Sequence, residues 1–335
     1  CLNRDDLGAP KSAVFGGVQR ARVSSQCWKR AIRELAQTIS TDAFKGSRTR
    51  KAAIELTSVL VSQFGWTETE ARKTAEEVLH LFLSKELPKA KKGKKDSDTE
   101  SDKEDTSTLL YFSPDEIKRI AKGIHDAKQA KPETDAKALK DCAIKALGKS
   151  VPCDAVDIAI FGRMVANASD VTLEGAGMFS HALSTHKSSN EIDFWTAVED
   201  EKQIGDDAGA ANMGTGEFNS ACYYRYIAIN VDMLFDKAHL ACIKDVEQKK
   251  SILTSFIRAA VLAVPNARKN SMFGFNPPAY VLGVRRAGQP ISLVNAFEKP
   301  ILADKEGYAK PSEAALKAHW ANLKKLYCLK TETEA

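Results

Sequence analysis

Apolar residues recur at helical spacing just after the start of the chain. They stand three or four residues apart, which places them on one face of a helix: Trp28, Ala31, Ile32, Leu35, Ala36 and Ile39. Ser24 or Ser25 can begin this helix, because a serine oxygen accepts an amide proton from the first turn. The pattern predicts an amphipathic helix that begins at one of these serines.

The same periodicity predicts four further helical stretches. They cover 51–87, with a break near "FGWTETE", then 113–147, 245–264 and 312–327. Thr67 with Glu70 has the spacing of a capping box, and "SPDE" from Ser113 combines such a box with proline at the first helical position. Gly148 is an expected helix stop. Residues 41–150 are therefore expected to form a largely helical block.

Strand-like alternation appears in three places. It covers Val156–Met164, Tyr223–Met233 and "AYVLGVRR" at 279–286. The opening residues are rich in Gly, Asp and Pro and are expected to form a loop that leads into an extended segment ending at Val23. With the helical block set aside, the order is helix, strand, strand, helix, strand.

One more strand in front would complete βαββαβ, the ferredoxin-like plan that RNA-recognition modules also use. The chain begins with Cys rather than Met, so we expect a missing N-terminal segment that contributes this strand. The fold class predicted from the pattern is α+β.

Two segments break the regular pattern. Residues 85–106, "KELPKAKKGKKDSDTESDKEDT", are almost without apolar side chains and are predicted to form a disordered surface loop. The connection between the two middle strands, about 165–221, is too long for a hairpin turn. Long connections of this kind often carry function.

Composition adds limits but no activity. The 335 residues are 43% hydrophobic and carry a net charge of +5, which permits a polyanionic partner without requiring one. The seven cysteines include no CxxC pair, so we expect free thiols in a reducing compartment rather than a disulfide framework or a zinc ribbon. No stretch predicts a membrane span or a signal peptide.

The stretch "RARVSSQCWKRAIR" gathers positive charge at the start of the first helix. Five of the fourteen residues from Arg20 to Arg33 are Arg or Lys. A helix N-terminus repels cations, at a cost of about 0.3–1 kcal/mol each. Free amides, serine hydroxyls and clustered cations together suit a phosphate, which would turn this repulsion into attraction. For any single cation, a solvated surface position is the simpler interpretation.

No catalytic motif is present: we find no HExxH, GxSxG, Walker loop or GxGxxG. His181 and His186 do not share a helical face and are expected to be structural. Asp5 and Asp6 can hold Mg²⁺ for phosphodiester cleavage, although acidic pairs in such loops are more often turn residues. Met164 is expected in a core.

Several contiguous motifs resemble one protein family. They are "CLNRDDLGAPKSAVFGGVQRARVSSQCWKRAIR", "DIAIFGRM", "SHALSTH", "EIDFWTAVED", "MGTGEFNSACYYRYIAIN" and "VNAFEKP", in order from residue 1 to about residue 300. They are similar to the CasC family, the Cas-seven-type backbone subunits of type I-E Cascade, a CRISPR surveillance complex. The helical block carries no matching motif.

The resemblance implies a hand-shaped subunit. An RRM-like palm would comprise 1–40, a strand at 151–164, and 222–335. Helical fingers would fill 41–150, with a disordered loop near 88–108, and a β-hairpin thumb would fill 165–221. Copies would polymerise along the CRISPR RNA, grip its phosphates, kink it periodically and present bases to target DNA in antiviral defence, through an R-loop.

The resemblance also implies RNA-binding residues. They are Arg4, Arg20, Arg22, Ser24, Gln26, Lys29, Arg30, Arg33, Arg163, Met164, Trp195 and Thr196. Met164 would pack against the RNA at its kink, and Trp195 with Thr196 would wedge beside a displaced base. The tip reads Phe194-Trp195, so either ring can be the wedge.

The implied partners are CRISPR RNA, target DNA, further copies of the chain, the other Cascade subunits and a recruited helicase-nuclease, in the cytoplasm and without a membrane. No cofactor, metal or catalytic activity is expected. The alternatives are a metal-dependent RNA-cleaving subunit of the type III kind, using Asp5 or Asp6, and a free-standing single-strand-binding module.

Overall fold

The computed structural model describes residues 2–84, 109–165, 167–197, 212–265, 267 and 269–335. Helices and strands are mixed, in agreement with the predicted α+β class. The predicted loop near 88–108 lies outside the described residues. The chain divides into unit 1 (1–35, 179–228 and 257–335) and unit 2 (36–178 and 229–256). The boundaries of palm, fingers and thumb stay a prediction.

A four-stranded antiparallel sheet organises unit 1, in the order β1-β2-β6-β9. Its strands are β1 (Ser12–Phe15), β2 (Val18–Val23), β6 (Ala182–Ser184) and β9 (Tyr223–Tyr224). The predicted opening loop covers residues 2–11, and the predicted extended segment ending at Val23 is the β1–β2 hairpin. Its two-residue turn places Gly16 and Gly17 at φ +60° and +76°, a left-handed conformation that glycine adopts at little cost.

The first predicted helix is confirmed as α1 (Ser25–Ile39). Its apolar face is buried: Trp28, Ile32 and Ala36 are each at most 5% exposed. The chain leaves strand β2 and enters α1 within two residues. The start of α1 therefore lies at the end of a central strand of the sheet.

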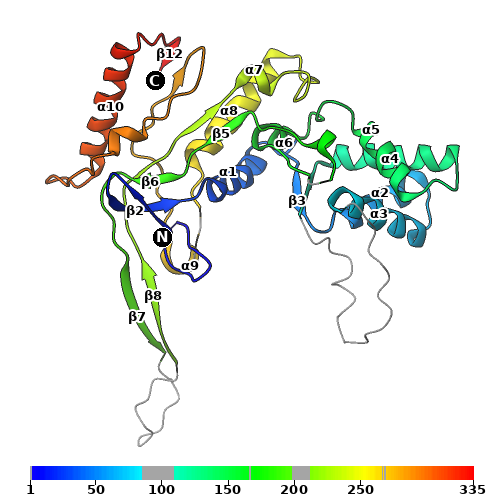
Figure 1. The fold of residues 1–335 in the computed structure, drawn as a ribbon, viewed down its shortest axis with the longest axis horizontal. Coiled ribbons are helices and arrows are strands. Elements are labelled where there is room, and N and C mark those ends of the chain that lie inside the picture. The colour runs from blue at the N-terminus through cyan, green and yellow to red at the C-terminus, as the bar shows by residue number, and fades with distance from the viewer. Residues whose placement is uncertain (1, 85–108, 166, 198–211, 266, 268) are drawn as a thin grey trace, which may run out of the picture. The chain divides into compact units, whose positions relative to one another are not determined.

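A long two-stranded ribbon also belongs to unit 1. It consists of β7 (Glu191–Ala197) and β8 (Asn212–Phe218), paired antiparallel with Trp195 opposite Gly214 and Phe194 opposite Thr215. Figure 1 shows the two strands running side by side away from the four-stranded sheet. The predicted long connection therefore includes a β-hairpin.

Four helices form the core of unit 2: α2 (Ala52–Phe64), α3 (Glu68–Leu83), α4 (Pro114–Ala130) and α5 (Ala136–Leu147). Their buried faces meet in one hydrophobic cluster that includes Leu56, Leu79 and Ile120. Ser113 and Glu116 form the predicted capping box of α4, and Thr67 caps α3. The sequence prediction of a helical block is confirmed.

The strand predicted at Val156–Met164 is wrong. Residues Val156–Phe161 form helix α6, which ends at Gly162 with φ +77°. Every side chain of α6 is buried, and a short apolar run that is buried on all sides does not reveal its period. The backbone amide of Gly46 donates to the buried Asp157 carboxylate at 3.1 Å.

Two other strand predictions hold only in part. Tyr223–Met233 is divided into β9, β10 (Ile227–Ile229) and the short helix α7 (Val231–Leu234), and "AYVLGVRR" keeps only β11 (Val284–Arg285), which pairs with β12 (Thr333–Glu334). The predicted C-terminal helices are confirmed as α8 (Val246–Leu262) and α10 (Ala309–Leu326). The remaining elements are β3 (Ser47–Thr49), β4 (Leu110–Phe112), η2 (Ser169–Val171), β5 (Gly177–Phe179), α9 (Lys269–Met272) and η3 (Val294–Phe297).

The prediction that all cysteines are free is wrong for one pair. Cys153 and Cys242 form a disulfide within unit 2, across a sequence separation of 89 residues. The free cysteines of the described residues are Cys27, Cys142, Cys222 and Cys328. Spacing in the sequence does not reveal this pair because the two residues meet only in the folded chain.

Candidate nucleic-acid interface

The N-terminus of α1 is built by a serine cap and a supporting loop. Ser24 is the cap: its Oγ accepts from the Cys27 amide at 3.3 Å, and its own amide donates to Asn3 Oδ1 at 3.0 Å. Ser24 is only 8% exposed, so its hydroxyl serves the helix. Of the two candidate serines, the structure selects Ser24.

One face of α1 carries the predicted polar and cationic residues. Lys29, Arg30 and Arg33 stand three, four and seven residues after Gln26, so the four residues share a face. The first turn contains no acidic residue. We call these four residues the cationic face.

Two cations of this face, Arg30 and Lys29, have contacts that the structure describes. The Arg30 side chain is 76% exposed and pairs with Glu34 at 2.7 Å, an interaction that contributes little at a surface. The Lys29 ammonium lies 5.2 Å from the Phe179 ring centre. A polyanion can therefore compete with Glu34 for the exposed Arg30.

His181 accepts a hydrogen bond from the first residue of α1, a specific role that the sequence does not predict. Its Nδ1 accepts from the Ser25 amide at 2.8 Å, so this nitrogen is unprotonated in the structure. Burial lowers the pKa of His181, and the positive charges of Arg22 and Lys11 lower it further. Lys11 and His181 thus lie at the candidate site, and they occur in the motifs "GAPKSAV" and "SHALSTH".

Arg20 is a structural residue. Its guanidinium is fully buried and donates to the carbonyl oxygens of Phe15, Ser184, Phe297 and Glu298, at 2.8–3.2 Å. A phosphate cannot reach a guanidinium whose protons are already donated inside the protein. The prediction that the Arg20 side chain binds RNA is therefore corrected.

Arg163 is also structural. It is 7% exposed, forms a 2.8 Å ion pair with the buried Glu116, and donates to the Val171 carbonyl at 2.9 Å. This position corrects the prediction of an RNA contact. Met164 beside it is 87% exposed, so the prediction that Met164 lies in a core is wrong. Its thioether is available to a partner.

Arg4 and Arg22 are half-buried and partly committed. Arg4 donates to the Gly8 carbonyl and, at 3.2 Å, to Met272 Sδ. Arg22 Nε donates to the Ser12 carbonyl at 3.3 Å, which is a long hydrogen bond. Arg22 therefore retains more capacity for a phosphate than Arg4.

The β7–β8 hairpin separates the two candidate aromatic rings. Neighbouring residues of a strand point to opposite faces, so Phe194 and Trp195 cannot lie on one side of the ribbon. Trp195 is 46% exposed, and a Cβ on Gly214 would lie 2.6 Å from its ring. Thr196 shares the Phe194 face.

Asp5 has a local structural role. Its Oδ1 accepts from the amides of Leu7 and Ala9 at 3.0 and 2.8 Å, the arrangement of a turn residue. Asp6 is exposed. Among the residues that the structure describes, no group of three or more His, Cys, Asp or Glu side chains suits a metal ion.

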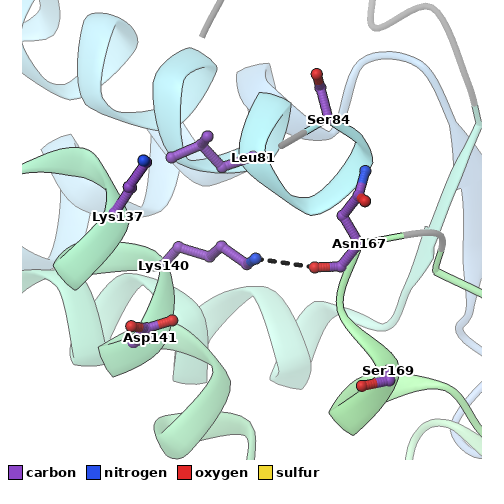
Figure 2. A pocket seen from close by; sticks show the side chains of 7 residues that line it. All are labelled: Leu81, Ser84, Lys137, Lys140, Asp141, Asn167 and Ser169. Atoms are coloured by element: carbon purple, nitrogen blue, oxygen red, sulfur yellow. Dashed lines mark hydrogen bonds between the residues drawn. The ribbon is translucent and has the colours of Figure 1, made fainter. Parts of the chain in front are cut away.

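A polar pocket of about 400 Å³ lies in the helical unit. Figure 2 shows Lys140 pointing across it, with its Nζ donating to the Asn167 carbonyl at 2.8 Å. Lys137 and Asp141 of α5 line the same wall. No predicted site residue lines this pocket.

The sequence-predicted residues are thus divided between the units. Unit 1 holds the cationic face, Arg4, Arg22, Trp195 and Thr196, and unit 2 holds Arg163 and Met164. Within the described part of the chain, no helix has the length and apolar character needed to cross a membrane.

Comparison with known proteins gives one family and several solved structures. The model of the CT1975-like protein family matches residues 1–335. One similar solved chain belongs to a "CRISPR RNA-guided surveillance complex, pre-nicking"; it is 30% identical, with 98% of this chain and 86% of that chain covered and a TM-score of 0.76. A second, from a "CRISPR RNA-guided surveillance complex", is 27% identical, with 98% and 85% covered and a TM-score of 0.63.

No curated protein matches the chain. The family match spans the full length, and it agrees with the motifs that run from residue 1 to about residue 300. The chain therefore belongs to the CT1975-like family, and its resemblance to the Cas-seven-type backbone proteins of Cascade is confirmed.

Proposed function

We propose that this chain is a CRISPR RNA-binding backbone subunit of a type I-E Cascade complex. The observation that carries the proposal is the cationic face, which begins at a serine-capped helix N-terminus without an acidic residue in its first turn. Both solved relatives are subunits of RNA-guided surveillance complexes. A guide RNA supplies the anion that this helix start lacks.

Recognition of the guide is proposed to be independent of its sequence. Phosphate contacts from Lys29, Arg30, Arg33 and Arg22 position the RNA, and base pairing with target DNA reads the sequence. Trp195 on the β7–β8 hairpin and the exposed Met164 are proposed to contact bases at the periodic kinks.

The proposed architecture follows the family. An RRM-like palm is supported by the β2–α1 succession, although helix α6 stands in place of a predicted palm strand. The helical block is proposed as fingers and the β7–β8 hairpin as thumb. Copies of the chain, other Cascade subunits, target DNA and a helicase-nuclease are the proposed partners, in the cytoplasm.

The chain itself is proposed to be without catalytic activity. The type III alternative requires a free loop carboxylate. Asp5 accepts two backbone hydrogen bonds that hold its own turn, so the exposed Asp6 is the carboxylate that the alternative would use. The alternative predicts cleavage of complementary RNA in Mg²⁺ that disappears in Asp5→Ala or Asp6→Ala. Such cleavage by the purified complex would contradict the proposal that the chain is without catalytic activity.

Neutralising the cationic face tests the RNA grip. We expect Lys29→Ala/Arg33→Ala to weaken RNA binding for every guide sequence, because phosphates are common to all of them. The slope of log affinity against log salt should fall by about one for each phosphate that the variant no longer binds. Filter binding of several unrelated single-stranded RNAs across a salt series measures both effects.

A matched control keeps the charge change and moves it elsewhere. Lys325 and Lys330 are exposed near the end of α10, so Lys325→Ala/Lys330→Ala removes the same charge from another surface. This control should bind nearly as well as the wild type. An equal loss of RNA affinity in both variants would show that only net charge matters. A loss of affinity that depends on RNA sequence would contradict the proposed phosphate contacts.

A further inference from the structure

Two exposed aromatic side chains follow α9 in unit 1. Phe273 is 69% exposed and Phe275 is 48% exposed, although large aromatic side chains are costly to leave in water. No predicted role uses them. Their exposure suggests that a partner covers them.

The segment that carries these rings is anchored to the N-terminal loop. Arg4 Nη2 donates to Met272 Sδ at 3.2 Å, and a Cβ on Gly274 would lie 3.1 Å from Leu2 Cδ2. Phe273 stands between these two contacts. Because successive Cα atoms are about 3.8 Å apart, its backbone runs directly beside residues 2–4.

The same loop supports the start of α1. The Cys27 thiol lies 3.9 Å from the Leu2 carbonyl oxygen, and Asn3 Oδ1 accepts from the Ser24 amide at 3.0 Å. Residues 2–4 therefore touch both the aromatic segment and the first turn of α1. The Cys27 thiol that Leu2 touches lies within electrostatic range of Lys11 and Arg30, so the aromatic segment is linked through residues 2–4 to positive charge at the start of α1.

Cations and exposed aromatic rings together fit one class of ligand. Single-stranded nucleic acid presents phosphates to the cations and flat bases to the rings, and each stacked base contributes about 1–3 kcal/mol. A protein partner would need an acidic and apolar surface to satisfy the same groups. The positive charges beside the segment favour nucleic acid.

We propose that Phe273 and Phe275 form a base-stacking platform for the RNA strand whose phosphates lie on the cationic face of α1. This platform rests on the proposed RNA-binding function and is separate from the β7–β8 hairpin. The platform stacks bases on unit 1 whatever their identity, because every base has an aromatic face.

The test compares an RNA with its abasic counterpart. The probes are a mixed-sequence single-stranded RNA and a strand of equal length that keeps the phosphates and lacks the bases. Phe273→Leu/Phe275→Leu preserves apolar volume and removes the rings. We expect about tenfold weaker binding to the RNA and little change for the abasic strand.

The control variants separate the two proposals. Tyr327→Leu removes an aromatic side chain that is 65% exposed beyond α10, and it should not change either affinity. Lys29→Ala/Arg33→Ala should weaken both strands, because phosphates are common to them. Trp195 is intact in every variant, so its contribution cancels from the comparison.

Each other outcome has a defined meaning. Equal weakening on both strands, or no weakening on RNA, would overturn the platform and leave the phosphate grip intact. Unchanged RNA binding with an altered oligomeric mass in mass photometry would assign the rings to a protein interface instead. A wild-type protein that binds neither strand would overturn the proposed function itself.

Discussion

Single residues decide which predicted cations are available to RNA. Arg20 and Arg30 are both predicted ligands in one motif, yet Arg20 is fully buried and the side chain of Arg30 is 76% exposed. The buried guanidinium links β1, β6 and the 297–298 segment through carbonyl oxygens. The sequence cannot separate these roles, because they depend on distant carbonyl groups that only the fold brings to Arg20.

His181 gives a pH dependence to the start of α1. Its lowered pKa means that the folded state prefers the neutral ring, which accepts the Ser25 amide proton. The contribution to stability is complete above the ordinary histidine pKa of about 6.5 and is lost as pH falls through the lowered pKa. We expect His181→Ala to lower the free energy of unfolding at pH 8 by no more than about 0.5 kcal/mol, because water competes for the hydrogen bond of this exposed ring, and to show a smaller loss of stability on acidification.

Urea unfolding at a series of pH values measures this effect for the wild type and the variant. The difference between the two curves isolates His181 from other titrating groups. His80→Ala, on α3 in the other unit, is the control and should follow the wild type. Parallel curves for wild type and His181→Ala would contradict the assigned role.

At the scale of elements, helices with one apolar face are predictable and fully buried segments are not. The pattern locates α1 and its serine cap, because the buried apolar positions of its face alternate with polar and charged positions. It fails at α6, where all six residues are buried and no polar position marks the period. It also misses β1, whose partner strand follows a two-glycine turn.

The β7–β8 hairpin depends on a glycine opposite its tryptophan. Because a Cβ on Gly214 would lie 2.6 Å from the Trp195 ring, Gly214→Val should displace the ring. If Trp195 stacks on a base, RNA affinity should fall by about fivefold or more. Filter binding measures the effect, and ring displacement is read as a change in tryptophan emission that is absent when Gly214→Val is made in a Trp195→Phe background.

Thr215→Val is the matched control for the hairpin. Thr215 lies beside Gly214 on the opposite face, across from Phe194. We expect this variant to bind RNA like the wild type. If Thr215→Val weakens binding and Gly214→Val does not, Phe194 rather than Trp195 is the stacking ring.

For the whole molecule, the motifs predict the family and not the long-range pairings. The resemblance follows contiguous motifs over most of the chain, and the family match covers all of it. The Cys153–Cys242 bond has no such local signal, because its residues are 89 apart. Local motifs likewise do not reveal that 229–256 belongs to the same unit as the helical block.

The disulfide makes the stability of unit 2 depend on redox conditions. We expect reduction to lower the free energy of unfolding by about 2–4 kcal/mol, because the cross-link restricts the unfolded chain. Urea unfolding with and without dithiothreitol measures the difference. Cys153→Ser should make the two curves coincide, whereas Cys328→Ser, at an exposed free thiol, should leave the difference intact.

The β7–β8 ribbon has a further consequence. A pair of strands without a covering layer has no interior of its own, and isolated hairpins are barely stable in water. Residues 191–196 of this ribbon, which forms an arm of unit 1, are all exposed. The arm is therefore expected to become more rigid when a partner binds along it. We therefore expect a partner bound along the arm to protect it from chymotrypsin, which cuts after aromatic residues such as Phe194 and Trp195, and we expect faster cleavage there in the partner-free protein.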